Sequence, residues 1–314
     1  MNNKRQQKRG RDVHGVLLLD KPAGITSNDA LQIVKRLFNA GKAGHTGSLD
    51  RPATGMLPIC FGEATKFTSF LLNADKRYLA RCRLGAETTT GDADGEVTGS
   101  WPVPELTDED IVRVLQGFQG QIDQIPPMHS ALKHKGQRLY KLAYQGIEVE
   151  REPRTITIHS INLLRYEQDW FEIEVYCSKG TYVRTLVEDI GRQIGCGAHI
   201  TGLVRTEVGP FRAVAMTTLD EIADLSEKGL EFLDKLLLPI DTVVLEMPEI
   251  ILSESVSCYL GQGQAVIVPH APTQGMLRIY NENHDFLGVG EVLDDGRIAP
   301  RRLVNIWPGS LASD

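Results

Sequence analysis

The sequence predicts an α+β fold that is followed by a small β-rich C-terminal domain. Segments with the alternating apolar pattern of strands lie between segments with the 3.6-residue period of amphipathic helices. After about residue 245 the pattern changes to short apolar runs separated by turn residues, which is typical of a small β domain. The chain has 314 residues, a length that favours one or two domains.

The N-terminal part of the chain alternates between strands and helices. A predicted buried strand at 15–22 ends at its proline, and Ser27 or Asn28 is the predicted N-cap of the helix that follows. The capping-box pattern Thr107-x-x-Asp110 predicts the start of another helix. The predicted elements between them are a strand at 56–61, a helix at 63–72, a strand at 76–85 and a polar turn region at 88–97.

Residues 124–152 are predicted to be a long functional excursion. Their double proline, Pro126-Pro127, is incompatible with regular structure around it. The clearest strand follows at 171–178, where apolar and polar residues alternate. The remaining predicted elements are a helix at 181–195, a strand at 198–211, an acidic helical region at 217–236 and short strands at 264–268, 276–280 and 286–292.

The composition is that of an ordinary soluble globular protein, with 41% hydrophobic and 24% charged residues. No run approaches the roughly eighteen apolar residues that a membrane helix requires. The N-terminus, MNNKRQQKRGRD, is basic but lacks the apolar segment of a signal peptide, so we expect a cytoplasmic location and no membrane partner. The five cysteines form no C-x-x-C pair and no cluster of zinc-type spacing with histidine, so we expect reduced thiols and no metal site.

The charge distribution favours a nucleic-acid partner although the net charge is −7. Residues 1–60 carry ten Lys and Arg against four Asp and Glu, whereas residues 216–250 carry two against nine. Because the acidity is segregated, another face of the protein can be basic. The run KHKGQRLYKLAYQG adds cations interleaved with tyrosines, a composition suited to phosphate contacts and base stacking, although a solvated helix face has the same composition.

Three polar segments remain as candidates for chemistry, because the chain has no P-loop, no G-x-S-x-G, no H-E-x-x-H and no dinucleotide-binding fingerprint. Asp50 follows His45 in the glycine-rich run GHTGSLDRPATG, Tyr78 stands in KRYLARC, and Arg184 stands in CSKGTYVRT. Taken singly, each has an ordinary structural interpretation: a turn aspartate, a strand tyrosine and a surface arginine.

Seven segments together identify a known family. They are GVLLLDKPAGITSNDAL, AGHTGSLDRPATGMLPICFGEATKF, DKRYLARCRLG, TTTGDADG, QIPPMHSALKHKGQRLYKLAYQGIEVEREPR, CSKGTYVRTLVEDIG and GCGAHITGLVRTEVGPF. With this ordered set the chain resembles the bacterial TruB family of tRNA pseudouridine synthases from about residue 13 to residue 305. The resemblance implies isomerisation of uridine to pseudouridine at position 55, in the T loop of tRNA.

The resemblance also implies an architecture. It implies the pseudouridine synthase fold, with a mixed, largely antiparallel central sheet flanked by helices, and a C-terminal PUA-like RNA-binding domain. The segment FLGVGEVLDDGRIAPRRLV is similar to the end of the family's PUA domain. The implied division is a basic N-terminal tail at 1–12, a catalytic domain at 13–245 that includes an RNA-gripping insertion at 124–152, and the PUA-like domain at 246–314.

Catalytic roles follow from the matched positions. Asp50 matches the family's nucleophile, and a carboxylate with the usual aspartate pKa of about 3.9 is ionised at pH 7, so it needs no activating base. Its target is either C6 of the uracil or C1′ of the ribose. Arg184 matches the arginine that pairs with this aspartate, and a guanidinium can hold a carboxylate bidentately. Tyr78 matches the active-site tyrosine, which stacks on the target base and is placed for proton transfer. No cofactor is required.

RNA-binding roles follow in the same way. His45 matches a histidine that fills the space of the flipped nucleotide, and the insertion matches a segment that grips phosphates. Lys21 and Asp92 lie in family motifs where they either contact RNA or support the active site. The predicted RNA-binding residues are His45, Lys21, Asp92, Lys133, Arg138, Lys141 and Tyr182. The implied partner is the T stem-loop of tRNA, bound by a monomer without an obligate protein partner.

The sequence departs from the family pattern at a few positions. Arg51 and Pro52 follow Asp50, where the family usually has proline directly after the aspartate. His129 replaces a frequent tyrosine, and Tyr144 and Val204 replace frequent arginines. Two alternatives to a stand-alone synthase stay open: a non-catalytic RNA-binding or tRNA-folding protein on the same scaffold, and a guide-RNA-dependent synthase.

Overall fold

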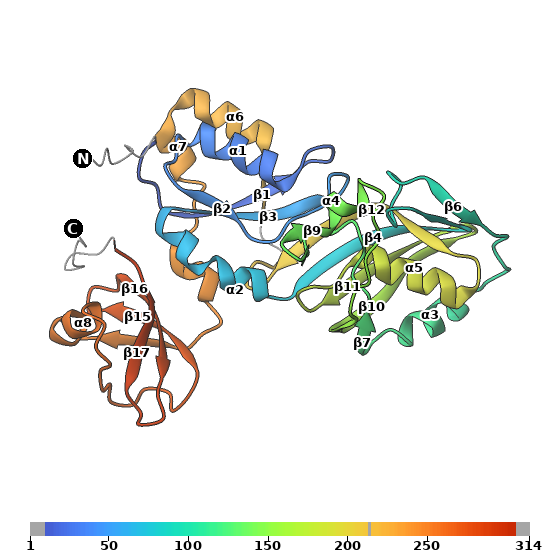
Figure 1. Ribbon diagram of the computed structural model, residues 1–314. Coiled ribbons are helices and arrows are strands. Elements are labelled where there is room, and N and C mark those ends of the chain that lie inside the picture. The colour runs from blue at the N-terminus through green and yellow to red at the C-terminus, as the bar shows by residue number, and fades with distance from the viewer. Residues whose placement is uncertain (1–9, 213–214, 306–314) are drawn as a thin grey trace. The chain divides into compact units, whose positions relative to one another are not determined.

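The computed structural model describes residues 10–212 and 215–305, whose elements are labelled in Figure 1. The described chain falls into two compact units. Unit 1 contains the residues up to Asp50, Met56–Leu72 and the residues from Gly209 onward, and unit 2 contains Arg51–Gly55 and Asn73–Val208. The boundary between Asp50 and Arg51 therefore falls inside the loop that carries the predicted nucleophile.

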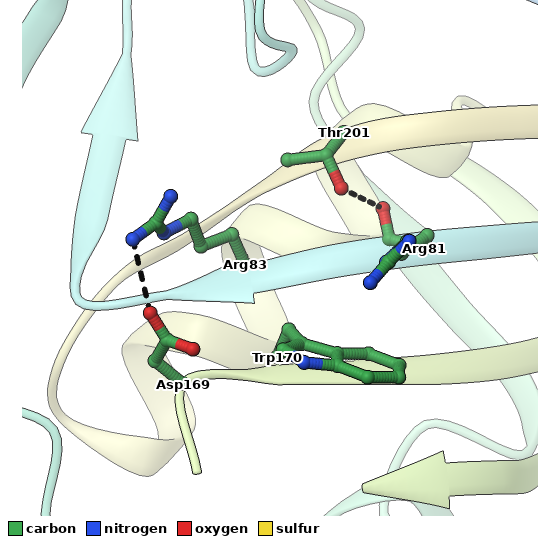
Figure 2. A pocket seen from close by; sticks show the side chains of 5 residues that line it. All are labelled: Arg81, Arg83, Asp169, Trp170 and Thr201. Atoms are coloured by element: carbon green, nitrogen blue, oxygen red, sulfur yellow. Dashed lines mark hydrogen bonds and ion pairs between the residues drawn. The ribbon is translucent and has the colours of Figure 1, made fainter. Parts of the chain in front are cut away.

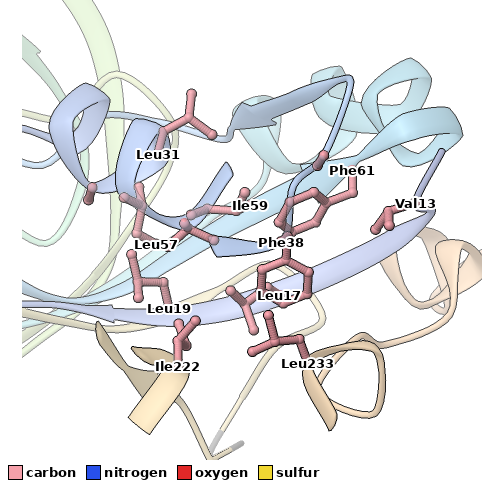
Figure 3. Packing of buried hydrophobic residues seen from close by; sticks show 13 residues of the cluster. Val13, Leu17, Leu19, Leu31, Phe38, Leu57, Ile59, Phe61, Ile222 and Leu233 are labelled. Atoms are coloured by element: carbon pink, nitrogen blue, oxygen red, sulfur yellow. The ribbon is translucent and has the colours of Figure 1, made fainter. Parts of the chain in front are cut away.

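Unit 1 begins with a small sheet packed against helices. β1 (Gly15–Lys21) lies between β13 (Thr217–Thr218) and β3 (Thr54–Phe61), and β2 (Ala43–His45) pairs antiparallel with β3. The helices of this part are α1 (Ser27–Leu37), α6 (Leu219–Lys228) and α7 (Leu230–Asp234). Apolar side chains from these strands and helices form one buried cluster (Figure 3), which includes a Phe38–Phe61 ring pair with centroids 4.8 Å apart. This core fixes the strands that the Asp50 loop joins.

The N-cap of α1 is Thr26, so the prediction of Ser27 or Asn28 was wrong. Thr26 has extended backbone, its hydroxyl accepts a hydrogen bond from the Asp29 N–H, and the Asp29 side chain accepts one from the Thr26 N–H. Ser27 has a different role because its side chain is buried, with 2% exposed, and bonds the main chain of Leu49. The local sequence could not distinguish Thr26, Ser27 and Asn28, because all three residue types are favoured at the N-cap of a helix.

The predicted helix at 63–72 forms in two pieces, the 3₁₀ segment η1 (Gly62–Phe67) and α2 (Thr68–Asn73). After α7, the 3₁₀ segment η2 (Ile240–Val244) leads to a four-stranded sheet. Its order is β14 (Glu249–Leu252), β15 (Met276–Asn281), β16 (Phe286–Val292) and β17 (Ile298–Leu303), and α8 (Glu254–Gly261) follows β14.

Two details of this C-terminal sheet differ from the prediction. The strand predicted at 264–268 does not form, because only Val266 bridges to Ile298. The two edge strands, β14 and β17, and the helix α8 were not predicted, and β17 includes Pro300. Proline is tolerated in an edge strand because one side of the strand needs no ladder hydrogen bonds. The Lys66 ammonium donates to the Leu303 carbonyl at 2.9 Å, which ties η1 to this sheet within unit 1.

Unit 2 is built on an antiparallel sheet. Its order is β12 (Ala198–Val208), β4 (Lys76–Leu84), β11 (Trp170–Cys177), β10 (Arg154–Glu167) and β7 (Gly120–Gln124). The first residues of β3, Thr54 and Gly55, pair in parallel with β12. The helices α3 (Asp108–Gln116) and α5 (Val183–Ile194) pack on this sheet, and α3 begins with the predicted Thr107–Asp110 capping box. The mixed, largely antiparallel sheet is thus confirmed.

Two excursions leave the sheet of unit 2. β5 (Ala86–Thr88) and β6 (Val97–Ser100) form a hairpin around the predicted polar turn. In the insertion, the chain is irregular from residue 125 to residue 132, as the double proline predicts. Residues 133–143 are more regular than expected, because β8 (Lys133–His134) and β9 (Gln137–Arg138) form a tight hairpin that leads into α4 (Leu139–Ala143). Lys135 and Gly136 both have positive φ, as a two-residue hairpin turn of type I′ requires.

Candidate active site

In unit 1, the loop that carries Asp50 is anchored on both sides of its glycine-rich turn. Thr46, which is fully buried, donates its N–H to the Pro58 carbonyl at 3.1 Å. The Ser27 hydroxyl accepts from the Leu49 N–H at 2.8 Å and donates to the Leu49 carbonyl at 3.1 Å. The Asp50 side chain itself is exposed. An exposed carboxylate therefore follows directly after a residue whose two main-chain groups are fixed.

Lys21 and His45 also lie in unit 1. Lys21 is fully buried, and its ammonium donates to the carbonyls of Pro22 and Ile25 at 2.7 and 2.9 Å. These bonds hold the turn that precedes the Thr26 cap, which favours the supporting role over a phosphate contact. His45 ends β2 opposite Ile59 and is half-buried.

In unit 2, Tyr78 lies on β4 in a row of paired residues that ends at Gly55, the second residue of β3. Tyr78 is opposite Arg205 on β12, and Arg205 is opposite Gly55 on β3. Adjacent strands are about 4.8 Å apart, so Gly55 is only about 10 Å along the sheet from Tyr78. Gly55 has φ +96°, and a Cβ there would lie 2.3 Å from the Arg205 carbonyl oxygen, so only glycine permits this approach.

Arg205 is a functional candidate that sequence reasoning missed. Its side chain is 1% exposed, and it projects from the same face of the sheet as Tyr78, which is 8% exposed. Lys76 is on that face too, two residues before Tyr78. Burial, together with the nearby charge of Arg205, lowers the pKa of Lys76 to about 8. Buried cations are uncommon in an ordinary core, but the run GLVRTEV contains nothing that distinguishes Arg205 from a surface arginine.

Arg184 lies in the first turn of α5 and is also buried, with 5% exposed. Its guanidinium donates to the Thr90 carbonyl at 2.6 Å and to the His129 carbonyl at 2.8 Å. Its Nε is 3.9 Å from a carboxylate oxygen of Asp92. The structure thus brings together Arg184, the polar turn between β5 and β6, and the start of the insertion, which are far apart in the sequence.

Asp92 organises the turn that Arg184 contacts. Its carboxylate accepts hydrogen bonds from the Thr90 hydroxyl at 2.5 Å and from the Asp94 N–H at 3.1 Å. Asp92 is 8% exposed, which favours structural support of the turn over direct contact with RNA. Gly91, with φ +74°, lies between Thr90 and Asp92 at a point where a Cβ would be 2.9 Å from a carboxylate oxygen of Glu188. Burial raises the pKa of Glu188 to about 7.

Tyr182 is held by its main chain. Its N–H donates to the Gln124 side-chain oxygen at 2.8 Å, and its carbonyl accepts from the Gln124 amide at 3.1 Å. Gln124 is 2% exposed and ends β7, two residues before the double proline begins. The insertion is therefore tied to the start of α5 at two points, through Gln124 and through His129. Neither Gln124 nor His129 was singled out as functional from the sequence, because each is hydrogen-bonded to a residue more than fifty positions away in the chain.

The predicted RNA-gripping cations are exposed. Lys133, Arg138 and Lys141 lie on β8, β9 and α4, and the buried Leu139 and Leu142 anchor this part of the insertion. Their positions are compatible with phosphate contacts, which require accessible cations.

The described residues contain no group of three or more His, Cys, Asp or Glu side chains that could hold a metal ion. Within the described ranges, no helix is long and apolar enough to cross a membrane.

A pocket lies on the opposite face of the unit 2 sheet (Figure 2). Arg81, Arg83, Asp169, Trp170 and Thr201 line it. The Arg81 guanidinium is 4.2 Å from the centre of the Trp170 ring, and Arg83 pairs with Asp169 at 3.0 Å. Because successive residues of β4 point to opposite faces, these arginines project away from the side that carries Tyr78. The pocket is therefore not part of the predicted site.

Family models match nearly the whole chain. Residues 35–183 match the N-terminal domain of the TruB family pseudouridylate synthases, 184–245 match the tRNA pseudouridylate synthase B C-terminal domain, and 248–304 match the C-terminal region of pseudouridine synthase II TruB. Among curated proteins, tRNA pseudouridine synthase B of Nitrosococcus oceani is 55% identical over 301 residues, which cover 96% of this chain and 98% of the relative. The Coxiella burnetii protein of the same name is 54% identical over 295 residues, covering 94% and 96%.

Solved structures share the fold. A chain of a Cbf5-Nop10-Gar1 complex superposes with a TM-score of 0.74 at 26% identity, covering 94% of this chain and 86% of that one. A chain of an H/ACA RNP bound to a substrate RNA gives a TM-score of 0.73 at 22% identity, covering 98% and 93%, and this similarity shows the fold alone. The family models and the curated relatives together establish that the chain belongs to the TruB family of tRNA pseudouridine synthases, which are isomerases.

Proposed function

We propose that this chain converts uridine to pseudouridine at position 55 in the T loop of tRNA, with Asp50 as the nucleophile. The observation that carries the proposal is the Asp50 loop: an exposed carboxylate follows a residue whose two main-chain groups are fixed by Ser27, in a chain of this family. The curated relatives, named for tRNA, support the choice of substrate.

The proposed reaction is balanced without a cofactor. The Asp50 carboxylate attacks either C6 of the uracil or C1′ of the ribose, and the bond between N1 and C1′ breaks. The base turns, and a new bond forms between C5 and C1′. The proton displaced from C5 is removed and N1 gains one, so no electron is gained or lost overall. A carboxylate can take the first step because it is already deprotonated at neutral pH.

Tyr78 and Arg184 are proposed to act on the same uridine. The Tyr78 ring stacks on the target base, and its hydroxyl takes part in moving the proton from C5. Arg184 holds and aims the carboxylate, for which a planar guanidinium suits better than an ammonium. Its bonds to the Thr90 and His129 carbonyls support this role, because they restrict the orientations that the guanidinium can adopt.

The target uridine has to leave the folded T loop to be reached. Flipping it out costs roughly a few kcal/mol, and stacking on an aromatic ring recovers about 1–3 kcal/mol per base. The exposed cations of the insertion are proposed to bind phosphates during this step, and the C-terminal sheet at 246–305 is proposed to be a PUA-like RNA-binding domain.

Mapping of pseudouridine on tRNA tests the proposal. The purified full chain is incubated with an unmodified tRNA transcript, and pseudouridine is located by carbodiimide labelling and primer extension. We expect a new stop one nucleotide 3′ of position 55, which marks pseudouridine at 55, and no requirement for another protein or a guide RNA. Modification that occurs only when a guide RNA is added would instead favour the guide-dependent alternative, and RNA binding without any modification would favour the non-catalytic one.

A further inference from the structure

The insertion presents an exposed aromatic side chain. Tyr144, at the end of α4, is 79% exposed, which is unusual for a tyrosine. Its ring meets the His129 ring edge-on, with centroids 5.6 Å apart, and the Tyr140 ring in the same manner at 6.3 Å. Two neighbouring rings thus support the Tyr144 ring from the protein side.

The surroundings of this ring are cationic. No Asp or Glu occurs between Asp123 and Glu148, whereas four Lys and Arg residues do. All four are exposed: Lys133, Lys135, Arg138 and Lys141. An exposed ring among cations is the combination with which proteins bind single-stranded nucleic acid, because the ring stacks on a base and the cations meet the backbone. A protein partner would more often bury a patch that lacks lysines.

His129 joins this aromatic cluster to Arg184. The His129 ring contacts Tyr144, and its carbonyl accepts the 2.8 Å hydrogen bond from the Arg184 guanidinium. The next residue makes a second link, because the Ser130 carbonyl accepts from the Tyr140 N–H at 3.1 Å. A displacement of the aromatic cluster therefore acts directly on the segment that holds Arg184.

Two buried hydroxyls adjoin this segment. Ser130 follows His129 and Thr185 follows Arg184, and their side chains are 5% and 7% exposed. Neither hydroxyl has a hydrogen-bond partner among the described residues. Buried hydroxyls are ordinarily hydrogen-bonded, so these two are exceptions on the segments that carry His129 and Arg184.

We propose that an unpaired base of the RNA substrate stacks on Tyr144 and that this contact, through His129, positions the guanidinium of Arg184. The inference rests on the proposed function, because it assigns Tyr144 and His129 to the same RNA substrate. His129 is a positioning residue here, since it acts through Arg184. RNA bound at the insertion then raises the rate of the chemical step as well as the affinity.

Tyr144→Leu separates these effects in two measurements. The first is the dissociation constant for a T stem-loop RNA, and the second is the single-turnover rate at saturating RNA. Loss of one stacking contact predicts roughly tenfold weaker binding, and the coupling predicts a lower saturating rate as well. Tyr144→Phe, which restores the ring, is expected to recover most of both. Ile147→Ala is the matched control, because it removes an exposed apolar side chain of the same insertion without removing a ring.

The stacked base is located with 2-aminopurine. The analogue replaces each unpaired T-loop position in turn, and Asp50→Asn protein is used so that the RNA remains unmodified. One position should show fluorescence quenching that Tyr144→Phe retains and Tyr144→Leu loses. A His129→Leu/Tyr144→Leu double variant should lower the saturating rate no further than Tyr144→Leu alone, because both changes break the same connection.

The outcomes are distinguishable. Unchanged affinity and quenching in Tyr144→Leu overturn the stacking, and weaker binding with an unchanged saturating rate overturns the coupling to Arg184. In both cases a wild-type chain that modifies the RNA leaves the proposed function intact. A wild-type chain that binds the stem-loop but never modifies it overturns the proposed function, whereas the quenching experiment still reports on stacking.

Discussion

The Ser27 hydroxyl makes two hydrogen bonds with the main chain of Leu49, accepting from its N–H at 2.8 Å and donating to its carbonyl at 3.1 Å. Both residues are buried. One small side chain thus replaces the pairing that a neighbouring strand would give, at the position just before Asp50. A loop held by such bonds keeps a reactive side chain in place without a strand, because buried main-chain groups are costly to leave unpaired.

Replacement of Ser27 by alanine should therefore impair stability and activity together. The variant leaves the Leu49 N–H and carbonyl without these bonds, which costs about 1–3 kcal/mol. It also releases the residue that precedes Asp50, so the single-turnover rate at saturating tRNA should fall by at least about tenfold. Chemical denaturation and single-turnover assays at a temperature where the variant is folded measure the two effects.

Thr26→Ala is the matched control for Ser27→Ala. It removes the cap of α1 and should cost about 0.5–2 kcal/mol of stability, but it leaves the Leu49 bonds in place. Its single-turnover rate should be close to that of the wild type. Equal loss of rate in both variants would mean that helix stability, rather than the Ser27–Leu49 contact, controls the loop.

Asp50→Asn should abolish pseudouridine formation on a T stem-loop while leaving its binding nearly unchanged. The amide is similar in size to the carboxylate but is a far weaker nucleophile. Asp50 is exposed, so the substitution should not lower the free energy of unfolding by more than about 0.5 kcal/mol. Tritium release from C5-labelled RNA measures the reaction, and filter binding measures affinity. Activity near the wild-type level would remove Asp50 from the mechanism.

Arg184→Lys should lose most of the activity although the charge is kept. The guanidinium donates through separate nitrogens to the Thr90 and His129 carbonyls, and its Nε faces Asp92. A lysine ammonium is a single point and cannot reproduce this fork. We expect a fall of at least about a hundredfold in kcat, measured in the same tritium assay, with a smaller change in KM. If lysine supported normal turnover, positive charge alone would account for the role of Arg184.

Much of the fold could be predicted because the signals were local. The strand periodicity of Trp170–Cys177 and the Thr107–Asp110 capping box are properties of neighbouring residues, and both were confirmed. The N-cap of α1 was misplaced because the choice between Thr26 and Ser27 depends on Leu49, which is distant in the sequence. The strand predicted at 264–268 does not form for a similar reason. Among the described residues, its only pairing with β17 is the single bridge between Val266 and Ile298.

The residues that support the candidate site were harder to find than Asp50, Tyr78 and Arg184 themselves. Those three stand in distinctive motifs. Gln124 and His129, in contrast, act through contacts with the start of α5, a segment more than fifty residues away in the chain. Such contacts depend on tertiary packing and have no periodicity or composition of their own. The sequence could therefore indicate the insertion, but not the residues through which it is hydrogen-bonded to the start of α5.

Lys76 predicts a specific pH dependence of stability. Its pKa is lowered from 10.5 to about 8 by burial and by Arg205. Between these two values the unfolded chain binds a proton that the folded chain does not, so this group makes the free energy of unfolding rise with pH from about 8 to about 10.5. Below pH 8 the full destabilisation is present, on the order of 3 kcal/mol. Urea unfolding of the wild type and of Lys76→Met across this range should show that the wild type gains stability relative to the variant as the pH rises. Parallel profiles would contradict the buried, partly neutral lysine.

RNA binding should weaken with salt, and the cations of the insertion should account for part of that dependence. A contact between a cation and a phosphate releases counterions, so the logarithm of the binding constant falls with the logarithm of salt concentration by about 0.7 per contact for a single strand. Lys133→Gln and Lys141→Gln should each make this slope shallower by about that amount, because both side chains are exposed on the insertion. Lys228→Gln, at the end of α6 in the acidic region, is the control and should leave the slope unchanged.

Fluorescence anisotropy between 50 and 300 mM KCl with a labelled T stem-loop measures the slope. An affinity independent of salt would rule out the basic RNA-binding surface, whereas unchanged slopes in both insertion variants would place that surface elsewhere on the chain.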